Sequence, residues 1–178
     1  TANPNAPVDY QNMMDGLATE SGFPELSKTP VVWFGHSAMA NAPYHFAAWD
    51  LQTNGANNRR CAAAISIKGW YPGYSTDPDN PKPSYANSDL AGVPLMYIEG
   101  EYADANGRAV GSLNFKNNTS GAILSYFADV GAGHFDWNDN NCSYIAMYLR
   151  KIAQYRLPAT AAADGTATLQ VINTSTQG

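Results

Sequence analysis

The sequence predicts an α/β protein with a mostly parallel sheet and helices on both faces. Four short apolar stretches have the length and composition of buried strands, and segments with helical spacing alternate with them. This alternation favours parallel pairing, because each helix returns the chain to the start of the next strand. In addition, the first apolar stretch ends abruptly in Gly35-His36-Ser37. The predicted strands cover residues 31–34, 61–67, 93–98 and 122–127.

Helices are predicted for residues 10–21, for the segment after Ser37, for residues 109–117 and for residues 143–155. Pro43 is compatible with the second of these helices only in its first turn, where no backbone hydrogen bond is lost. Residues 69–91 are rich in Pro, Gly, Asp and Tyr and are predicted to form a long loop. We therefore divide the chain into a folded part, 1–158, and an Ala/Thr-rich tail, 159–178, with a strand-like piece at 169–172.

Length and charge exclude several classes of protein. A chain of 178 residues is one ordinary domain. Its net charge is -5, with 14% charged residues and no basic run, so neither nucleic acid nor a membrane surface is an expected partner. Asp136, Asp139 and Asn140 cluster in the sequence, but such residues are more often turn formers and helix caps. We expect no metal and no cofactor.

The asparagine residues of the sequence bear on whether the protein is secreted. Glycosylation sequons occur at Asn117, Asn118, Asn141 and Asn173. The sequence is rich in Asn and therefore produces sequons by chance, but they favour a secreted, extracellular glycoprotein. Two cysteines, Cys61 and Cys142, fall near opposite ends of the predicted sheet, and we expect them to stay unpaired.

The turn at Ser37 has the features of a nucleophile. A serine between a buried strand and a helix is held on a sharp turn with its hydroxyl above the sheet. Such a hydroxyl needs a base to take its proton. The sequence supplies a candidate base in His134, which lies in a Gly-rich turn after the fourth strand. His36 is interpreted as structural because it points away from Ser37 on the turn.

Parallel strands end at a common edge, where ligands bind. The first strand end contributes Ser37, the second Trp70, Tyr71 and Tyr74, the third Glu99, Glu101 and Asp104, and the fourth His134. Nucleophile, acid and base in this chain order are typical of a strand-turn-helix serine hydrolase. For the acid we favour Asp104, with Glu101 as the alternative and Glu99 behind both.

Together these segments resemble the α/β-hydrolase superfamily. The chain is similar to secreted esterases of the polyhydroxyalkanoate-depolymerase and feruloyl- or acetyl-esterase kind. The resemblance is carried by 21–26 leading into Gly35-His36-Ser37-Ala38, by 94–101 and by 131–135. It implies a serine ester hydrolase with catalytic Ser37, Asp104 and His134, and with the Ala38 N–H as an oxyanion donor. Trp70, Tyr71, Tyr74 and Phe135 are the expected substrate-binding side chains.

Two departures from the family pattern matter. Met39 stands where the motif Gly-x-Ser-x-Gly has its last glycine, so Ala40 is expected to take over the close contact between helix and strand. The family also has several strands before the serine turn, for which there is no room before Ser37. We interpret residues 1–158 as the C-terminal half of the fold, completed by a second chain or by an N-terminal segment outside these residues.

The predicted function is hydrolysis of a carboxylic ester in a small molecule or on a carbohydrate. A phenolic or sugar group in the substrate would suit the aromatic residues of the predicted loop 69–91. The alternative is a catalytically silent hydrolase-fold binding module or an inactive fragment. Met39 and the absent oxyanion strand favour this alternative, whereas the complete set of Ser37, Asp104 and His134 argues against it.

Overall fold

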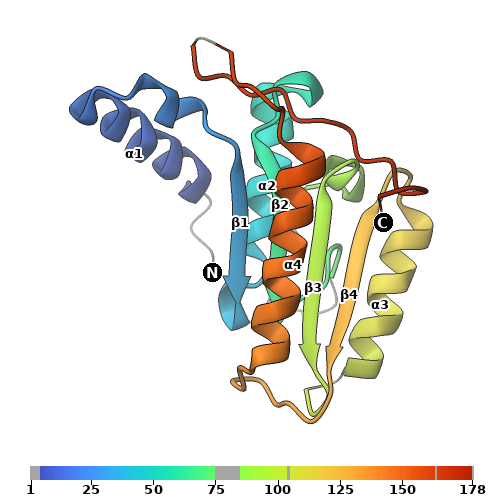
Figure 1. The fold of residues 1–178 in the computed structure, drawn as a ribbon. Coiled ribbons are helices and arrows are strands. Elements are labelled where there is room, and N and C mark those ends of the chain that lie inside the picture. Colours follow the sequence, from blue (N-terminus) through green and yellow to red (C-terminus); the bar gives the residue numbers. More distant parts are fainter. Residues whose placement is uncertain (1–4, 75–84, 104, 163, 178) are drawn as a thin grey trace.

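The computed structural model describes residues 5–74, 85–103, 105–162 and 164–177. Its centre is a parallel sheet of four strands in the order β1-β2-β3-β4, with all arrows in Figure 1 pointing the same way. The strands are β1 (Val31–His36), β2 (Cys61–Ile67), β3 (Pro94–Gly100) and β4 (Ile123–Asp129).

The register brings the four strand ends to one level. His36 pairs with Ile67, Ile67 pairs with Ile98, and Ile98 pairs with Phe127. Every residue that directly follows a strand therefore emerges at the same edge, the lower one in Figure 1. This edge is where the sequence analysis expects the site.

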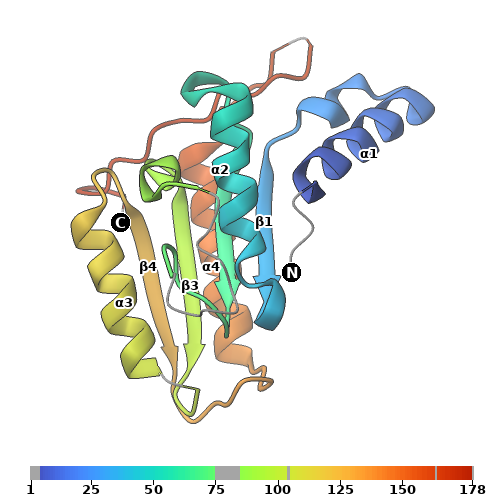
Figure 2. The same ribbon diagram turned by 180° about the vertical axis from the view of Figure 1, so that it is seen from behind.

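Helices cover both faces of the sheet, as predicted. On one face lie α2 (Ala42–Asn54) and α3 (Ala105–Asn118), and on the other lies α4 (Asp139–Arg156), as Figures 1 and 2 show from opposite sides. The first face packs a cluster that includes Tyr44, Leu95 and Phe115. The second face packs Ile65, Met96, Tyr148 and Ile152. The residues of β2 and β3 are thus divided between two separate cores, and both strands are apolar almost throughout.

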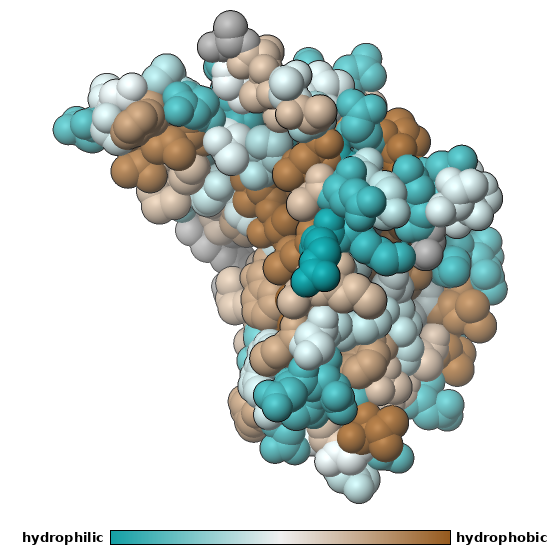
Figure 3. All heavy atoms as spheres, in the orientation of Figure 1, coloured by the Kyte–Doolittle hydropathy of each residue, from teal (hydrophilic) through white to brown (hydrophobic). Residues whose placement is uncertain are grey.

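The first helix, α1 (Ala6–Ser21), projects from the body of the molecule beside β1 (Figure 1). Tyr10 anchors it through edge-on ring contacts with Trp33 at 4.6 Å and with Phe46 at 6.3 Å. Its outer residues Met13 and Leu17 are exposed, and Figure 3 shows hydrophobic surface on this projecting part.

The prediction of a strand at 169–172 is wrong. These residues form no strand, although Leu169 and Ile172 pack against the cluster under α4. The segment instead exchanges hydrogen bonds with the end of α4: the Gln170 N–H donates to the Arg156 carbonyl at 2.8 Å, and the Arg156 guanidinium donates to the Gln170 carbonyl at 2.9 Å. Alternating apolar residues in the tail therefore reflect docking on a helix end.

Both cysteines are free, as expected, with Cys61 buried in β2 and Cys142 exposed on α4. Among the described residues, no helix combines the length and the apolar composition that a membrane span requires.

Candidate active site

Ser37 directly follows β1 in a left-handed backbone conformation, with φ of 57°. Few residues other than glycine adopt this conformation, and where they do it is frequently part of a functional turn. Ser37 also begins a single 3₁₀ turn, Ser37–Met39, which is closed by a 3.0 Å hydrogen bond from the Ala40 N–H to the Ser37 carbonyl. The chain then enters α2, with Pro43 in its first turn. This is the strand-turn-helix geometry that the sequence predicts.

Small residues make the turn possible. A β-carbon on Gly35 would lie 2.1 Å from the Met39 carbonyl oxygen. A β-carbon on Gly69 would lie 2.3 Å from the β-carbon of Ala40 and 2.6 Å from the Ser37 carbonyl oxygen. Ala40 is fully buried, whereas the Met39 side chain is 55% exposed. Ala40 therefore makes the close contact, as expected, and Met39 does not obstruct the turn.

His134 lies in the loop between β4 and α4, and its Nε2 is 2.7 Å from the Oγ of Ser37. Two contacts hold this loop against the sheet. The Nε2 of His36 lies 3.2 Å from the His134 carbonyl oxygen, and Gly100 leaves room for the Ala132 and Gly133 carbonyls at the end of β3. The structure thus brings together two residues that are 97 positions apart in the chain.

The candidate acids differ in position. Asp104 lies outside the described residues, immediately before α3 begins. Glu101 is exposed, and its Oε2 accepts a 2.7 Å hydrogen bond from the Gly131 N–H at the start of the His134 loop.

Glu99 is almost fully buried and lines the same pocket as Ser37 and His134. Its carboxylate accepts hydrogen bonds from the Tyr97 hydroxyl and, at 3.0 Å, from the Gly100 N–H. Burial raises the pKa of Glu99, and this effect outweighs the opposing influence of the two hydrogen bonds and of the charges on Arg108 and His134.

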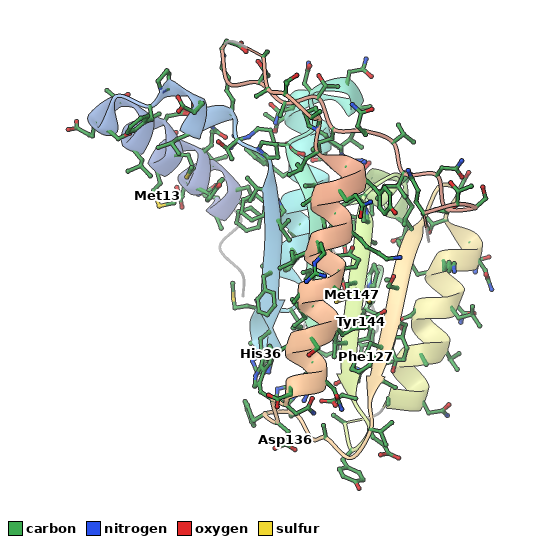
Figure 4. All side chains as sticks on the ribbon, viewed as in Figure 1. Met13, His36, Phe127, Asp136, Tyr144 and Met147 are labelled. Carbon is green, nitrogen blue, oxygen red and sulfur yellow. The ribbon has the colours of Figure 1, made fainter. Side chains whose placement is uncertain are left out.

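A pocket of about 360 Å³ opens at Ser37. Its lining residues are Ser37, Ala38, Lys68, Gly69, Trp70, Glu99, Ala103, Arg108 and His134. A larger hollow of about 510 Å³ lies between β4 and α4 around Phe127, Tyr144 and Met147, which Figure 4 labels. Neither Ser37 nor His134 lines that hollow, so the smaller pocket is the one that contains candidate chemistry.

The expected substrate-binding aromatic residues have different surroundings. Trp70 lines the pocket, and its ring stacks on Tyr74 with centroids 4.2 Å apart. The Arg108 guanidinium lies 4.5 Å from the Trp70 ring centroid. Tyr71 packs against α3 so closely that a β-carbon on Gly111 would come 2.2 Å from its ring. Phe135 is 75% exposed and contacts the His134 ring edge-on.

Sequence reasoning interpreted His36 as structural but did not find the contacts by which His36 and Lys68 support the His134 loop. Lys68 is completely buried beneath it and forms an ion pair with Asp129. His36 ends β1 and contacts the His134 carbonyl oxygen, and Figure 4 shows it above Asp136, which lies near the bottom of the molecule. The spacing of residues in the sequence indicates neither the Lys68–Asp129 ion pair nor the contact of His36 with His134. Both depend on which strand ends become neighbours in the sheet. Within the described ranges, no three His, Cys, Asp or Glu side chains are grouped so that they could hold a metal ion.

The comparisons with known proteins concern the fold. A single-residue variant of SOBER1 from Arabidopsis thaliana matches with a TM-score of 0.51 and 17% identity, over 83% of this chain and 64% of that protein. TT1662 from Thermus thermophilus matches with a TM-score of 0.53 and 16% identity, over 84% of this chain and 63% of that protein. A Bacillus cereus carboxylesterase has a TM-score of 0.48 and 17% identity, over 82% of this chain and 59% of its own.

No protein-family model matches the sequence, and no curated protein matches it significantly. The parallel sheet, the turn at Ser37 and the matches to solved structures together define an α/β-hydrolase fold. The matches span less than two thirds of the length of these proteins.

Proposed function

We propose that this chain carries the catalytic centre of a serine ester hydrolase that works through an acyl-enzyme. The observation that supports the proposal most directly is the 2.7 Å contact between the Ser37 Oγ and the His134 Nε2, at a pocket and on a left-handed turn. A nucleophile and a base within hydrogen-bond reach are the required geometry for covalent catalysis by serine.

The reaction uses these groups in two stages. His134 takes the hydroxyl proton as the Ser37 Oγ attacks the ester carbonyl carbon, and the Ala38 N–H donates to the resulting oxyanion. The tetrahedral intermediate collapses, His134 gives the proton to the departing alcohol, and the acyl group remains on Ser37. His134 then deprotonates a water that attacks this acyl group, and the proton returns to Ser37 as the acid leaves.

A carboxylate must orient the imidazole and stabilise its protonated form. Asp104 is our proposed acid, with Glu101 as the alternative. Glu99 is also tested as the acid, because it is buried and lines the same pocket as His134. Separate replacements Asp104→Asn, Glu101→Gln and Glu99→Gln identify the acid, because only its loss lowers kcat by about 10⁴ through the wrong imidazole tautomer.

One feature of the pocket favours a substrate that carries a ring. Trp70 is the aromatic residue that lines it, and a ring supported by Tyr74 offers a rigid face for stacking. We propose a phenolic or carbohydrate-linked ester on this basis.

We also propose that a further segment pairs with β1, either from a second chain or from sequence N-terminal to these residues. Among the described strands, β1 has a neighbour on one side only, and Phe34 on it is 51% exposed. An open apolar edge of this kind attracts another strand. The mass of the natively isolated protein distinguishes the two sources.

Secretion remains a proposal supported by the sequons. Asn117, Asn118 and Asn173 are exposed. Asn141 is buried, and its side-chain amide donates to Asp129 at 2.7 Å, so it is not accessible to glycosylation in the folded chain. Secretion from a eukaryotic host followed by glycosidase digestion is the test, with a mass shift expected from sites other than Asn141.

The experiment for the proposed function is hydrolysis of 4-nitrophenyl acetate by the wild type, Ser37→Ala and the control Ser88→Ala, which changes an exposed serine. We expect turnover in the wild type and the control, and a loss of at least about 10³-fold in Ser37→Ala. Equal turnover in all three contradicts the proposal. A folded but inactive wild type favours a silent binding module or an inactive fragment.

A further inference from the structure

Lys68 follows β2 and is the second residue in the described chain, besides Ser37, that has positive φ without being glycine, at 50°. Its backbone N–H remains in the sheet and donates to the Ile98 carbonyl at 2.7 Å. Its side chain has no exposed surface. A fully buried lysine is rare unless it is paired.

The Lys68 ammonium contacts both ends of the loop that carries His134. Its Nζ lies 3.1 Å from the Asp129 Oδ2, at the end of β4. The ammonium also donates to the backbone carbonyl of Asp136, two residues beyond His134. The ion pair and this hydrogen bond therefore close the loop at its base.

The anionic partner is itself fixed. Asn138 donates to one oxygen of Asp129 at 2.9 Å, and Asn141 donates to the other at 2.7 Å. Burial by itself would raise the pKa of Asp129, but the hydrogen bonds from Asn138, Asn141 and Lys68 outweigh it, so the pKa lies below its ordinary value. The ion pair thus joins β2, β4 and the first turn of α4.

The residue next to Lys68 contacts the nucleophile turn. Gly69 packs against the Ser37 carbonyl and the Ala40 β-carbon at distances that exclude any side chain on residue 69. Two consecutive residues therefore touch both parts of the candidate site. The Gly69 backbone supports Ser37, and the Lys68 side chain holds the segment around His134.

We propose that Lys68 is a positioning residue, which fixes His134 relative to Ser37 through its ion pair with Asp129 and its hydrogen bond to Asp136. The inference rests on the proposed function and adds to it the group that sets the distance between nucleophile and base. Catalysis is sensitive to such distances, and a displacement of about 1 Å lowers rates by about 10²-fold.

A purely structural role for the ion pair is the competing explanation. Replacing a buried ion pair by apolar or neutral groups of similar volume often leaves stability unchanged, whereas removing one partner leaves an uncompensated charge. The double variant Lys68→Met/Asp129→Asn consequently separates the two roles. If the pair serves only stability, a folded double variant has wild-type catalysis.

The experiment compares the wild type, Lys68→Met, the double variant and the control Lys28→Met, which removes the exposed ion pair between Lys28 and Asp164. We measure denaturant unfolding, kcat and KM for 4-nitrophenyl acetate, and the rate of fluorophosphonate labelling. For the folded double variant we expect kcat and the labelling rate to fall about 10- to 100-fold with KM nearly unchanged, and for Lys28→Met no change. A folded double variant with wild-type kcat and labelling rate overturns the positioning role.

A second measurement does not depend on turnover. In ¹H–¹⁵N spectra of the folded double variant, we expect shifted His134 ring resonances and faster hydrogen exchange of the amides in residues 130–138. Unchanged ring resonances and exchange overturn the proposal even if the wild type proves inactive. An inactive wild type whose His134 resonances do respond to the double replacement contradicts the proposed function while preserving the positioning effect.

Discussion

Gly69 lies so close to Ala40 that a β-carbon on residue 69 would come within 2.3 Å of the Ala40 β-carbon. Through this contact, the turn after β1 packs against the residues that follow β2, and the chain continues from the turn into α2. It also explains why Met39 is tolerated where the motif Gly-x-Ser-x-Gly has its last glycine: the Met39 side chain is exposed, and Ala40 makes the close contact.

Overpacking at Ala40 should therefore destabilise the protein, whereas a change at Met39 should not. We expect Ala40→Leu to lower the free energy of unfolding by about 1–3 kcal/mol or more, because the added atoms meet the Gly69 backbone. Met39→Ala should stay within about 0.5 kcal/mol, as for other surface changes. Denaturant unfolding measures both, and a larger loss for Met39→Ala would contradict this account of the turn.

His36 should matter for turnover rather than for binding. Its Nε2 lies 3.2 Å from the His134 carbonyl oxygen, and His36→Phe keeps a ring but removes the donor. A hydrogen bond contributes about 0.5–1.5 kcal/mol, so we expect kcat to fall by up to about tenfold with KM unchanged. His45→Phe, near the start of α2, is the control and should leave kcat as it is. A rise in KM at constant kcat would assign His36 to substrate binding instead.

The pKa of Asp129 predicts an acid-dependent loss of stability. Because the folded state lowers this pKa below 3.8, the stabilisation is fully present above about pH 4 and is lost as the pH falls through the folded value. In Asp129→Asn, unfolding should depend less on pH below about pH 4. At pH 7 this variant should be less stable by about 3–5 kcal/mol, because Lys68 is left as an unpaired buried charge.

Unfolding by urea at several pH values between about 2 and 7 is the measurement for Asp129. Asp15→Asn, on the projecting helix α1, serves as the comparison and should follow the wild-type pH dependence. If Asp129→Asn and the wild type lose stability in parallel on acidification, the Asp129 carboxylate does not carry this effect.

The two cysteines should react at very different rates. Cys142 is exposed, whereas burial in β2, with the nearby Asp50 charge, raises the pKa of the Cys61 thiol far above its ordinary value. With a thiol-specific disulfide reagent we expect one equivalent to react rapidly in the native protein and the second only after unfolding. Cys142→Ser should abolish the rapid phase, and a rapid phase that persists in that variant would show that Cys61 is accessible.

The strands and the turn at Ser37 were predictable because their signals are local. The apolar runs of β2 and β3 are buried on both faces, and Gly35 and Ser37 mark the turn within a few residues of sequence. The proximity of Ser37 and His134 was also predictable, because parallel strands end at one edge and both residues follow strands.

Other features depend on tertiary contacts that the sequence pattern does not encode. Lys68 resembles an ordinary residue after a strand, and only the arrangement of β2 beside β3 and β4 places its ammonium under the His134 loop. Tyr71 was expected to bind substrate because it is an aromatic residue that follows the second strand. In the structure it packs against α3 instead, because Gly111 has no side chain there. The apolar pattern at 169–172 predicted a strand, whereas the segment docks on the end of α4.

Reaction with a fluorophosphonate probe, read by intact mass and peptide mapping, tests the central claim most directly. An activated serine attacks this probe, and activation requires the base at 2.7 Å. We predict a single adduct on Ser37 in the wild type and no adduct in Ser37→Ala or His134→Ala. A folded wild type without an adduct, or an adduct that persists in His134→Ala, would contradict the pairing of Ser37 and His134 as nucleophile and base.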